Sequence, residues 1–360
     1  DGTERPLKLR YYQVQGVLHL LAMPRFLLGD DTGLGKCVTR DTLVLTDRGL
    51  VEIGSLGPGG DLPPDSFHPP REPTRVWTGW KWAPVRSFYT SGRKPTRRVV
   101  TRRGYEVTGS EVHPLYVRGE AGEGFVPLRE LAPGAYVAID RSGAAFPETE
   151  PELPVPDPTT IDPHARVYPK VPRELSPALA ALLGYVVAEG WTGSRWGFAV
   201  TQFRDLNPEV HDDIRHLFGE VLGWDGNGKN RDRDRNVTVS SVYLREYLHG
   251  VGVGYDLSGT KKVPWPIFRG TRRSVASFLR AFFDGEGSVS GGVVEVSSAS
   301  ERLLREIQIL LLRFGIVCTR SPQTVKGRST TYWRLCFCGD DARAFRREIG
   351  FLSPRKTKAL

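Results

Sequence analysis

The sequence predicts a multidomain protein in which an all-β domain precedes an α+β domain with internal pseudo-twofold symmetry. Two observations support this fold class. Short alternating runs of polar and apolar residues fill residues 37–145, and one pattern of helices and strands occurs twice in residues 173–360. The first pattern is typical of short strands and turns, and the second indicates a duplicated folding unit. A length of 360 residues agrees with two or three domains rather than one.

Composition and charge indicate which class of molecule the protein binds. The chain carries a formal net charge of +9 and has a pI of about 9.4, which favours polyanions, nucleic acid above all. No apolar run is long enough to span a bilayer, and the first four residues, Asp1–Glu4, do not resemble a signal peptide. We therefore expect a cytoplasmic protein with no membrane partner.

The four cysteines are too few and too scattered to form a disulfide framework: Cys37, Cys318, Cys336 and Cys338. No CxxC motif or histidine pair accompanies them, so a zinc site is not expected. Cys336 and Cys338 occupy alternate positions of a strand-like run, and alternate side chains share one face of a strand. We expect that face to be the core side.

Strand-like runs recur through residues 37–145, as in 97–101 and 105–108. Residues 146–172 contain eight prolines, a composition typical of a stiff linker. This linker separates the predicted β domain from the duplicated region, whose two copies span about 173–268 and 269–360.

The duplication is clearest at two apolar helices. Ser176 and the proline after it predict the start of the first helix, with serine as the N-cap. The run Leu182–Gly190 then matches the run Leu279–Gly287, and each run ends in an acidic residue followed by glycine. The two acidic residues, Glu189 and Glu286, are 97 residues apart at equivalent positions.

The segments that follow each helix also match. A strand-like run is followed by a helical pattern, then by another strand, a short helix and a lysine-bearing segment. The matching pairs are 196–202 and 293–298, 208–222 and 301–314, and 261–264 and 354–358. Two copies of one unit in a single chain predict a monomer with a pseudo-twofold axis between the copies.

Small residues four apart on each helix predict close helix packing: Gly184 and Ala188, and Ala281 and Gly285. Helices paired in this way bring Glu189 and Glu286 together at their C-terminal ends. Two neighbouring carboxylates repel each other unless a cation lies between them, and oxygen ligands favour Mg²⁺ or another hard divalent cation. Such an ion beside DNA supports phosphodiester hydrolysis. The alternative is that both glutamates simply end amphipathic helices, which the repeat argues against.

Residues 173–360 resemble the LAGLIDADG homing endonucleases. The second helix follows the family's nine-residue pattern, with Asp284 in place, whereas the first has Val187 where the family often has an acid. The resemblance implies a DNA endonuclease with Glu189 and Glu286 as its metal ligands.

The same resemblance implies one lysine near the metal in each half, where it helps to polarise water or the phosphate. Lys261 is the candidate in the first half, and Lys356, with Lys358 close behind, in the second. Double-stranded DNA would lie on the strands after each motif helix, because antiparallel ribbons fit the major groove. The candidate DNA contacts are Arg195, Gln202 and Arg204 in the first half and Gln323, Lys326 and Arg328 in the second.

Residues 37–145 resemble the N-terminal part of an intein, the Hint fold, through three runs: Cys37–Thr42, Gly109–Pro114 and Phe125–Gly134. The resemblance implies that the Cys37 thiol attacks the carbonyl of Lys36 and converts that amide into a thioester. It also implies that His113 protonates the leaving nitrogen. Ser110, at the family's threonine position, would hold the scissile peptide by hydrogen bonding.

Residues 1–36 are predicted to be a fragment of the protein that hosts the intein. The run Leu27–Lys36 resembles the ATP-binding Walker A loop of Swi/Snf-type superfamily-two helicases, with Asp30 in place of the first glycine. A hydroxyl residue normally follows the lysine, and here Cys37 follows it. An insertion between lysine and hydroxyl explains the break. We expect no ATP binding by this fragment, because it lacks the sheet and helix that shape the loop.

An intein ends in His-Asn, and this chain ends in Lys358-Ala359-Leu360, so we expect no unaided splicing. The predicted function is N-terminal self-processing together with metal-dependent double-strand cleavage of the intein-less helicase gene. Two alternatives stay open. A helicase fragment predicts a later Asp-Glu-x-His box, which the sequence lacks. A degenerate endonuclease would only bind DNA or be inert.

Overall fold

The computed structural model describes ten stretches of the chain: residues 37–79, 81–119, 122–141, 145–161, 169–193, 197–224, 236–239, 241–254, 257–324 and 331–360. The predicted host fragment, residues 1–36, lies outside them. None of the helices in these stretches has the length and apolar character needed to cross a membrane.

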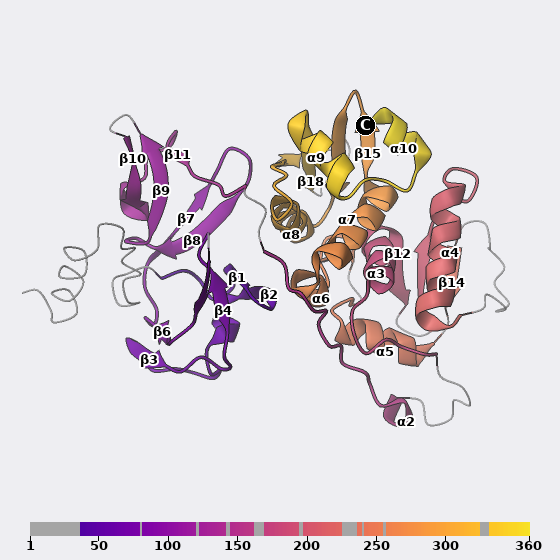
Figure 1. Ribbon diagram of the computed structural model, residues 1–360, viewed down its shortest axis with the longest axis horizontal. Helices are drawn as coiled ribbons and strands as arrows, with labels where there is room; N and C mark the ends of the chain where they lie inside the picture. The colour runs from indigo at the N-terminus through magenta and orange to yellow at the C-terminus, as the bar shows by residue number, and fades with distance from the viewer. Residues whose placement is uncertain are drawn as a thin grey trace, which may run out of the picture.

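Residues 37–141, here called the β-rich part, form strands and two single-turn 3-10 helices, η1 (Ile53–Leu56) and η2 (Leu128–Glu130), in their described residues (Figure 1). A four-stranded antiparallel sheet has the order β2 (Gly49–Glu52), β1 (Leu43–Thr46), β4 (Arg75–Trp77) and β5 (Trp82–Pro84). A three-stranded sheet has the order β10 (Gly122–Pro127), β9 (Pro114–Gly119) and β11 (Tyr136–Val137). Two further antiparallel pairs join β3 (Ser66–His68) to β6 (Phe88–Thr90) and β7 (Thr96–Val100) to β8 (Glu106–Ser110).

The turn between β1 and β2 lies against the backbone of Phe268 and Arg269, far along the chain. The Thr46 hydroxyl donates to the Gly49 carbonyl at 2.7 Å, and Gly49 has a φ of +89°, which glycine adopts without strain. A Cβ at Gly49 would overlap the backbone of Phe268 and Arg269. Only glycine therefore meets both the conformational and the spatial demand at this turn.

Residues 169–360, here called the helix-and-strand part, are built around α3 (Pro177–Glu189) and α7 (Arg272–Glu286), which lie side by side (Figure 1). An antiparallel sheet of β12 (Gly190–Gly193), β13 (Gly197–Thr201) and β14 (Asn236–Val239) lies beside α3, together with α4 (Pro208–Leu222). A sheet in the order β15 (Ser288–Ser290), β16 (Val293–Ser298), β18 (Tyr332–Cys338) and β17 (Thr319–Gln323) packs with α7, α8 (Glu301–Leu312) and α9 (Asp340–Glu348). The shorter helices of this part are α5 (Val242–Gly250), α6 (Trp265–Arg269) and α10 (Pro354–Ala359), and the four-residue helix α2 (Pro158–Ile161) precedes it.

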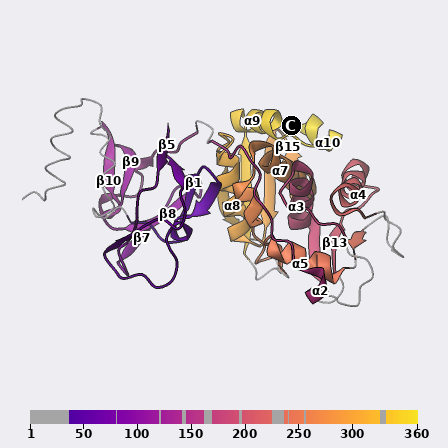
Figure 2. The ribbon, with the colours of Figure 1, turned by 60° about the horizontal axis from the view of Figure 1, so that its bottom comes forward.

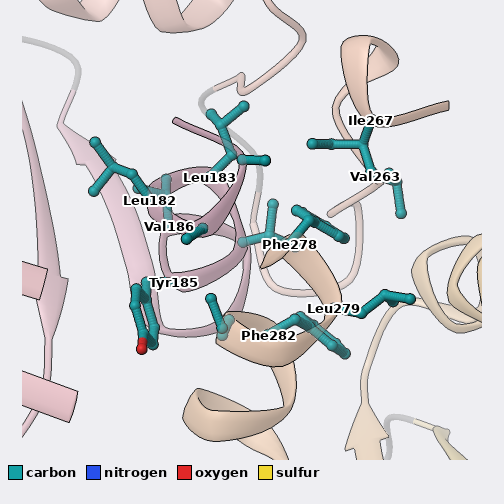
Figure 3. Close-up of a cluster of buried hydrophobic side chains, with 14 of the residues drawn as sticks. Leu182, Leu183, Tyr185, Val186, Val263, Ile267, Phe278, Leu279 and Phe282 are labelled. Atoms are coloured by element: carbon teal, nitrogen blue, oxygen red, sulfur yellow. The ribbon is translucent and has the colours of Figure 1, made fainter. Parts of the chain in front are cut away.

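The start and the composition of α3 follow from its sequence. The Ser176 side chain accepts from the N–H of Leu179 at 3.1 Å, as the predicted N-cap requires. Every residue from Leu179 to Ala188 is buried, which explains why the helix is apolar on all sides. Figure 3 shows side chains of α3 and α7 in one apolar cluster with Val263 and Ile267.

The predicted repeat is present, with one difference between its copies. The predicted helices 208–222 and 301–314 are α4 and α8, and the predicted strands 196–202 and 293–298 are β13 and β16. The sequence pattern missed β12 and β15, the short strands that follow the motif helices directly. In the described chain the second copy has two strands, β17 and β18, where the first has β14.

The described part of the proline-rich segment is packed rather than free. The Glu150 carboxylate accepts from the Thr271 backbone N–H at 3.1 Å, the Thr271 hydroxyl at 2.6 Å and the Ser274 hydroxyl at 2.6 Å, at the start of α7. Leu153 is buried, and the Arg313 guanidinium lies 3.9 Å from the centre of the Phe146 ring. The segment therefore follows the surface of the helix-and-strand part instead of acting as an open spacer.

The predicted strand with Cys336 and Cys338 is β18, but the expected core position of the two thiols was wrong. Cys338 is exposed and Cys336 is half-buried, whereas Leu335 and Phe337 are buried. Since neighbouring residues on a strand face opposite sides, the larger apolar pair occupies the core, where it removes more apolar area from water. All four cysteines are free thiols.

The tip of the β7–β8 hairpin contacts α8 and β17 of the helix-and-strand part through hydrogen bonds; Figures 1 and 2 show β7, β8 and α8. The Arg320 backbone N–H donates to the Arg103 carbonyl at 2.9 Å, and the Arg320 guanidinium donates to the Gly104 carbonyl at 2.8 Å. The Arg305 guanidinium donates to the Glu106 carboxylate at 2.7 Å. Gly104 has a φ of +84°, and a Cβ there would lie 2.6 Å from the Arg320 carbonyl oxygen. The hairpin is thus specifically docked.

Candidate active sites at the paired helices and at Cys37

The two motif helices touch through their small residues. A Cβ at Gly184 would overlap the carbonyl oxygen of Phe278 and lie 2.9 Å from the Cβ of Ala281. A Cβ at Gly285 would lie 2.7 Å from the Cβ of Ala188. Because these distances are below van der Waals contact, only glycine allows α3 and α7 to approach so closely. The predicted packing through small residues is confirmed.

This packing brings Glu189 and Glu286 together, since each is the last residue of its helix. A Cβ at Gly285 would lie 3.5 Å from the Cγ of Glu189. Partial burial raises the pKa of Glu189 above its usual range, while Lys261 and Lys356 oppose the rise. The pKa of Glu286 rises to about 7, first because desolvation disfavours its charged form and then because Glu189 is negatively charged. The Glu286 residue is nevertheless exposed to solvent.

Lys261 and Lys356 lie at the C-terminal ends of the two motif helices. The Lys261 Nζ donates to the carbonyls of Val187 at 2.9 Å and Ala188 at 3.0 Å. The Lys356 Nζ donates to the carbonyls of Phe283 at 2.9 Å and Asp284 at 2.6 Å. Carbonyls in the last turn of a helix lack an intrahelical donor, and the helix dipole favours a cation there. Each lysine is therefore fixed beside the glutamate of its own half.

Lys356 and the predicted alternative, Lys358, differ in how deeply they are buried. Lys356 is 6% exposed, whereas Lys358 is exposed on the same short helix. Desolvation lowers the pKa of Lys356 to about 8, although the negative charges of Asp284, Glu189 and Glu286 oppose the shift. Of the two lysines, Lys356 is therefore the one that is buried against the end of α7.

The donor set suits a hard divalent cation that is shared with a phosphate. Among the described residues no group of three or more His, Cys, Asp and Glu side chains could hold a metal. Mg²⁺, however, often takes only one or two carboxylates and completes its shell with waters and substrate phosphates. The repulsion that raises the pKa of Glu286 falls when a cation neutralises the pair. Glu189 and Glu286 therefore fit the predicted metal in chemistry and in number.

The predicted DNA contacts differ in where the structure places them. Arg195, Lys326 and Arg328 lie outside the described residues. Gln202 is 5% exposed, so its predicted DNA contact was wrong. The side chain follows β13 on the same face as the buried Val200, two positions earlier. The Arg204 side chain is 53% exposed and lies 3.5 Å from Asp212, and Gln323 is exposed at the end of β17.

One face of the four-stranded sheet is polar. Residues with buried apolar side chains, such as Val294 and Leu335, alternate with polar residues that share the opposite face: Ser288, Ser290, Glu295, Ser297, Ser321 and Arg334. Arg334 is paired with Glu295, and the Ser297 hydroxyl donates to the Gln323 side-chain oxygen at 3.4 Å. The sequence prediction named only Gln323 here. The pattern in 293–298 could have signalled Glu295 and Ser297, which lie in that run.

Cys37, Ser110 and His113 come together around Gly109. The Ser110 N–H donates to the Cys37 carbonyl at 2.8 Å, and Val38 forms a β-bridge with Gly109. A Cβ at Gly109 would lie 3.0 Å from the Cys37 carbonyl oxygen and 3.1 Å from the Cγ of His113. Cys37 and His113 therefore flank the same glycine. Lys36, on the other side of the predicted scissile bond, lies outside the described residues.

Comparison with known proteins identifies one domain and several partial relatives. A family model described as a LAGLIDADG-like domain matches residues 273–350. The chain is similar to the replication factor C small subunit of Thermococcus kodakarensis, at 27% identity over 96% of this chain and 36% of that protein. It is also similar to a DNA gyrase subunit of Mycobacterium gordonae, at 26% identity over 89% of this chain and 55% of that protein. The chain spans about a third of the length of the curated relatives that it first matches.

The chain is also similar to a third relative and to two solved structures. Glutamine–fructose-6-phosphate aminotransferase of Methanocaldococcus jannaschii is 28% identical over 53% of this chain and 18% of that protein. A mesophilic variant of the homing endonuclease I-DmoI is 17% identical, with a TM-score of 0.36, over 48% of this chain and 95% of that chain. Full-length DUF199/WhiA from Thermatoga maritima is 18% identical, with a TM-score of 0.33, over 51% of this chain and 57% of that chain. Over residues 273–350 the chain matches the LAGLIDADG-like domain family.

Proposed function

We propose that this chain is an intein with a homing endonuclease, inserted in the phosphate-binding loop of a helicase. The endonuclease would cut both strands of the helicase gene that lacks the insertion. The observation that carries the proposal is the pairing of Glu189 with Glu286 at the ends of two helices whose last carbonyls hold Lys261 and Lys356.

In this proposal Glu189 and Glu286 hold Mg²⁺ or another divalent cation, which when bound orients water and stabilises the leaving oxygen of a phosphodiester. Lys356 has a pKa of about 8 and is therefore mostly protonated at neutral pH, so it can donate to a phosphate oxygen. Lys261 has the same placement in the other half. The duplicated arrangement supplies one lysine for each DNA strand.

The polar face of the four-stranded sheet is the proposed DNA surface of the second half. Its serines, Arg334 and Gln323 offer donors and acceptors on a twisted antiparallel ribbon, and such ribbons enter the major groove. Arg204 offers an exposed positive charge in the first half. The net charge of +9 favours the same partner.

The relatives support an insertion rather than an ordinary domain. Proteins named as part of a replication factor, an aminotransferase and part of a DNA gyrase each align with this chain over about half of it or more. Because the names differ while the matched segment recurs, the segment behaves as an element carried by unrelated hosts. The helicase host itself is supported by the resemblance of Leu27–Lys36 to a Walker A loop.

The proposed self-processing step occurs at Cys37. Its sulfur would lose its proton and form a bond to the carbonyl carbon of Lys36 while the C–N bond breaks. His113 would give a proton to the leaving nitrogen, and the proton lost by the thiol would replace it, so that the step is balanced. The hydrogen bond from Ser110 to the Cys37 carbonyl fixes the attacking residue beside His113. The proposal covers this N-terminal step only.

A cleavage assay tests the endonuclease. The full chain is incubated with Mg²⁺ and a plasmid that carries the uninterrupted helicase sequence around its Gly-Lys-Thr codons, and linear product is expected. Glu189→Gln and Glu286→Gln should abolish cutting but retain DNA binding, whereas Glu130→Gln, a control whose side chain is 56% exposed on η2, should cut normally. If the unaltered chain does not cut the plasmid, the insertion either only binds DNA or is inert. Cutting by both site variants would overturn the metal assignment.

A thiolysis assay tests the self-processing step separately. Dithiothreitol should attack a thioester at Lys36–Cys37 and release a fragment with the mass of residues 37–360. Cys37→Ala should give no such fragment, because it removes the nucleophile. Equal release from Cys37→Ala would show that the cleavage does not use this thiol.

A further inference from the structure

We infer that Glu306 and Ser300, both from the second half of the repeat, are positioning residues for Lys261 in the first half's active site. The inference rests on the proposed endonuclease function. The inference begins from a difference between two residues at equivalent positions of the motif helices, Asp284 and Val187. Only Asp284 has a side chain that can hold the lysine-bearing segment of its own half in place.

In the second half, the motif helix α7 itself holds the segment that carries Lys356 in place. Asp284 is fully buried, and its carboxylate accepts from the backbone N–H groups of Leu352 at 2.8 Å and Ser353 at 3.1 Å. These residues lead into α10, whose Lys356 donates back to the Asp284 carbonyl at 2.6 Å. One residue of α7 thus holds both ends of this connection.

In the first half, the equivalent position is Val187, whose side chain cannot accept a hydrogen bond. The segment that carries Lys261 is held by the N-terminal region of α8 instead. The Ser300 hydroxyl donates to the Lys261 carbonyl at 2.6 Å, and the Glu306 Oε2 accepts from the Val263 N–H at 2.7 Å. The role of Asp284 is therefore taken over by residues from the other copy of the repeat.

Glu306 is itself held firmly. It is 6% exposed, and its second oxygen accepts from the Arg302 Nε at 2.8 Å, one turn earlier on α8. A carboxylate with both oxygens occupied has little rotational freedom, so it fixes the backbone at Val263. Lys261 lies two residues before this point, and its Nζ depends on that backbone to reach the carbonyls of α3.

Loss of this hold would leave the Val263 N–H buried without an acceptor, a condition that drives local rearrangement. Residues that orient active-site groups typically change activity by about tenfold or more when they are replaced. Because Glu306 acts on Lys261 and not on Lys356, the effect should fall on one strand of the DNA. A general loss of structure would slow both strands.

A strand-resolved experiment tests the inference. Lys261→Met and Lys356→Met first establish which strand each lysine serves, on a duplex labelled on either strand. Glu306→Met should then slow the Lys261 strand by about tenfold and leave the Lys356 strand unchanged, so that nicked DNA accumulates. Glu306→Gln keeps an oxygen that can accept from Val263 and should cut much more like the unaltered chain. Ser300→Ala is a second variant, which should slow the same strand as Glu306→Met.

Amide hydrogen exchange supplies a measurement that needs neither DNA nor metal. In Glu306→Met, the peptide that contains Val263 should lose protection, while the peptide that contains Leu352 and Ser353 should keep it. Unchanged protection at Val263, or equal slowing of both strands by Glu306→Met, would overturn the inference. An unaltered chain that cuts nothing would refute the endonuclease, and the exchange result would still decide whether Glu306 holds the Lys261 segment.

Discussion

A Cβ at Gly184 would overlap the carbonyl oxygen of Phe278, so the backbone of α7 fills the space that any side chain on this face of α3 would need. The contact explains how two long, largely buried helices can place their last residues side by side. It also makes the site sensitive to a single methyl group, because neither partner is a flexible side-chain end that could move away.

Gly184→Ala should destabilise the protein by about 1–3 kcal/mol or more, the usual cost of overpacking a core, as measured by urea denaturation. Gly219→Ala on α4 is the matched control. A Cβ at Gly219 would lie 3.4 Å from the nearest atom, the Trp224 carbonyl oxygen, so this change should gain about 0.5–1 kcal/mol from the lower entropy of the unfolded chain. Equal losses in the two variants would contradict the close packing.

In the metal-free protein, Glu286→Gln should reduce the loss of thermal stability that occurs as the pH rises. The pKa of Glu286 rises from 4.5 to about 7 on folding, so its favourable contribution is complete below pH 4.5 and is lost as the pH rises through 7. Glutamine does not titrate. Relative to Glu286→Gln, the unaltered chain should therefore lose thermal stability between about pH 5 and pH 8, as measured by unfolding temperature.

Added Mg²⁺ provides the control for this titration. A cation that binds only the folded pair should restore the unfolding temperature of the unaltered chain at pH 8 and leave that of Glu286→Gln nearly unchanged. A pH profile that is identical in both proteins would contradict the raised pKa.

Arg320→Met should weaken the docking of the β7–β8 hairpin. The Arg320 side chain is 2% exposed and lies between Glu301, at 2.5 Å, and Glu106, at 3.6 Å. Breaking a buried ion pair typically costs about 3–5 kcal/mol. Arg97→Met removes a pair with Glu111 that is about half exposed on both sides and should cost less than about 1 kcal/mol. Denaturation curves that shift by the same amount in both variants would argue against specific docking.

Arg204→Ala and Gln323→Ala should affect DNA binding in different ways. Loss of a phosphate contact by Arg204 should lower the slope of log affinity against log salt by about one, with little effect on sequence preference. Loss of a base contact by Gln323 should reduce discrimination between sites by about 1–3 kcal/mol and keep the salt slope. Binding titrations at several salt concentrations measure both. Gln202→Ala, at a buried position, should leave the salt slope unchanged.

The sequence was most informative where a signal is local and repeated. The serine N-cap predicted the start of α3, and the strand-like run that recurs after the second motif helix predicted β16 at Val293–Ser298. The pairing of Glu189 with Glu286 followed from the repeat together with the small residues four apart on each motif helix, since close packing of the two helices brings their last residues together. The lysines followed from the family resemblance, and their contacts with the helix ends agree with it.

The sequence was least informative about which face of a strand is buried. Gln202 and Cys336 lie on strands, or just after strands, that were expected correctly, yet each faces the opposite way from its predicted role. A shift of one residue reverses every side chain of a strand. β12 and β15 were missed because runs of three or four residues show no clear period.

The residues that hold the two lysine-bearing segments in place could not be predicted from the sequence. The hydrogen bond from Val263 to Glu306 joins residues 43 apart, and that from Leu352 to Asp284 joins residues 68 apart. Both acceptors bind backbone N–H groups, which every residue except proline has. No residue type marks such a partner, so only the folded chain shows it.

The docked hairpin has a consequence for the behaviour of fragments. β17 is the outer strand of its sheet, and the carbonyl of Arg103 covers part of that strand by accepting from Arg320. Without residues 37–141, the strand would present unpaired backbone groups to other molecules, and exposed outer strands are templates for strand addition. The isolated helix-and-strand part should therefore self-associate at concentrations at which the intact chain stays dispersed.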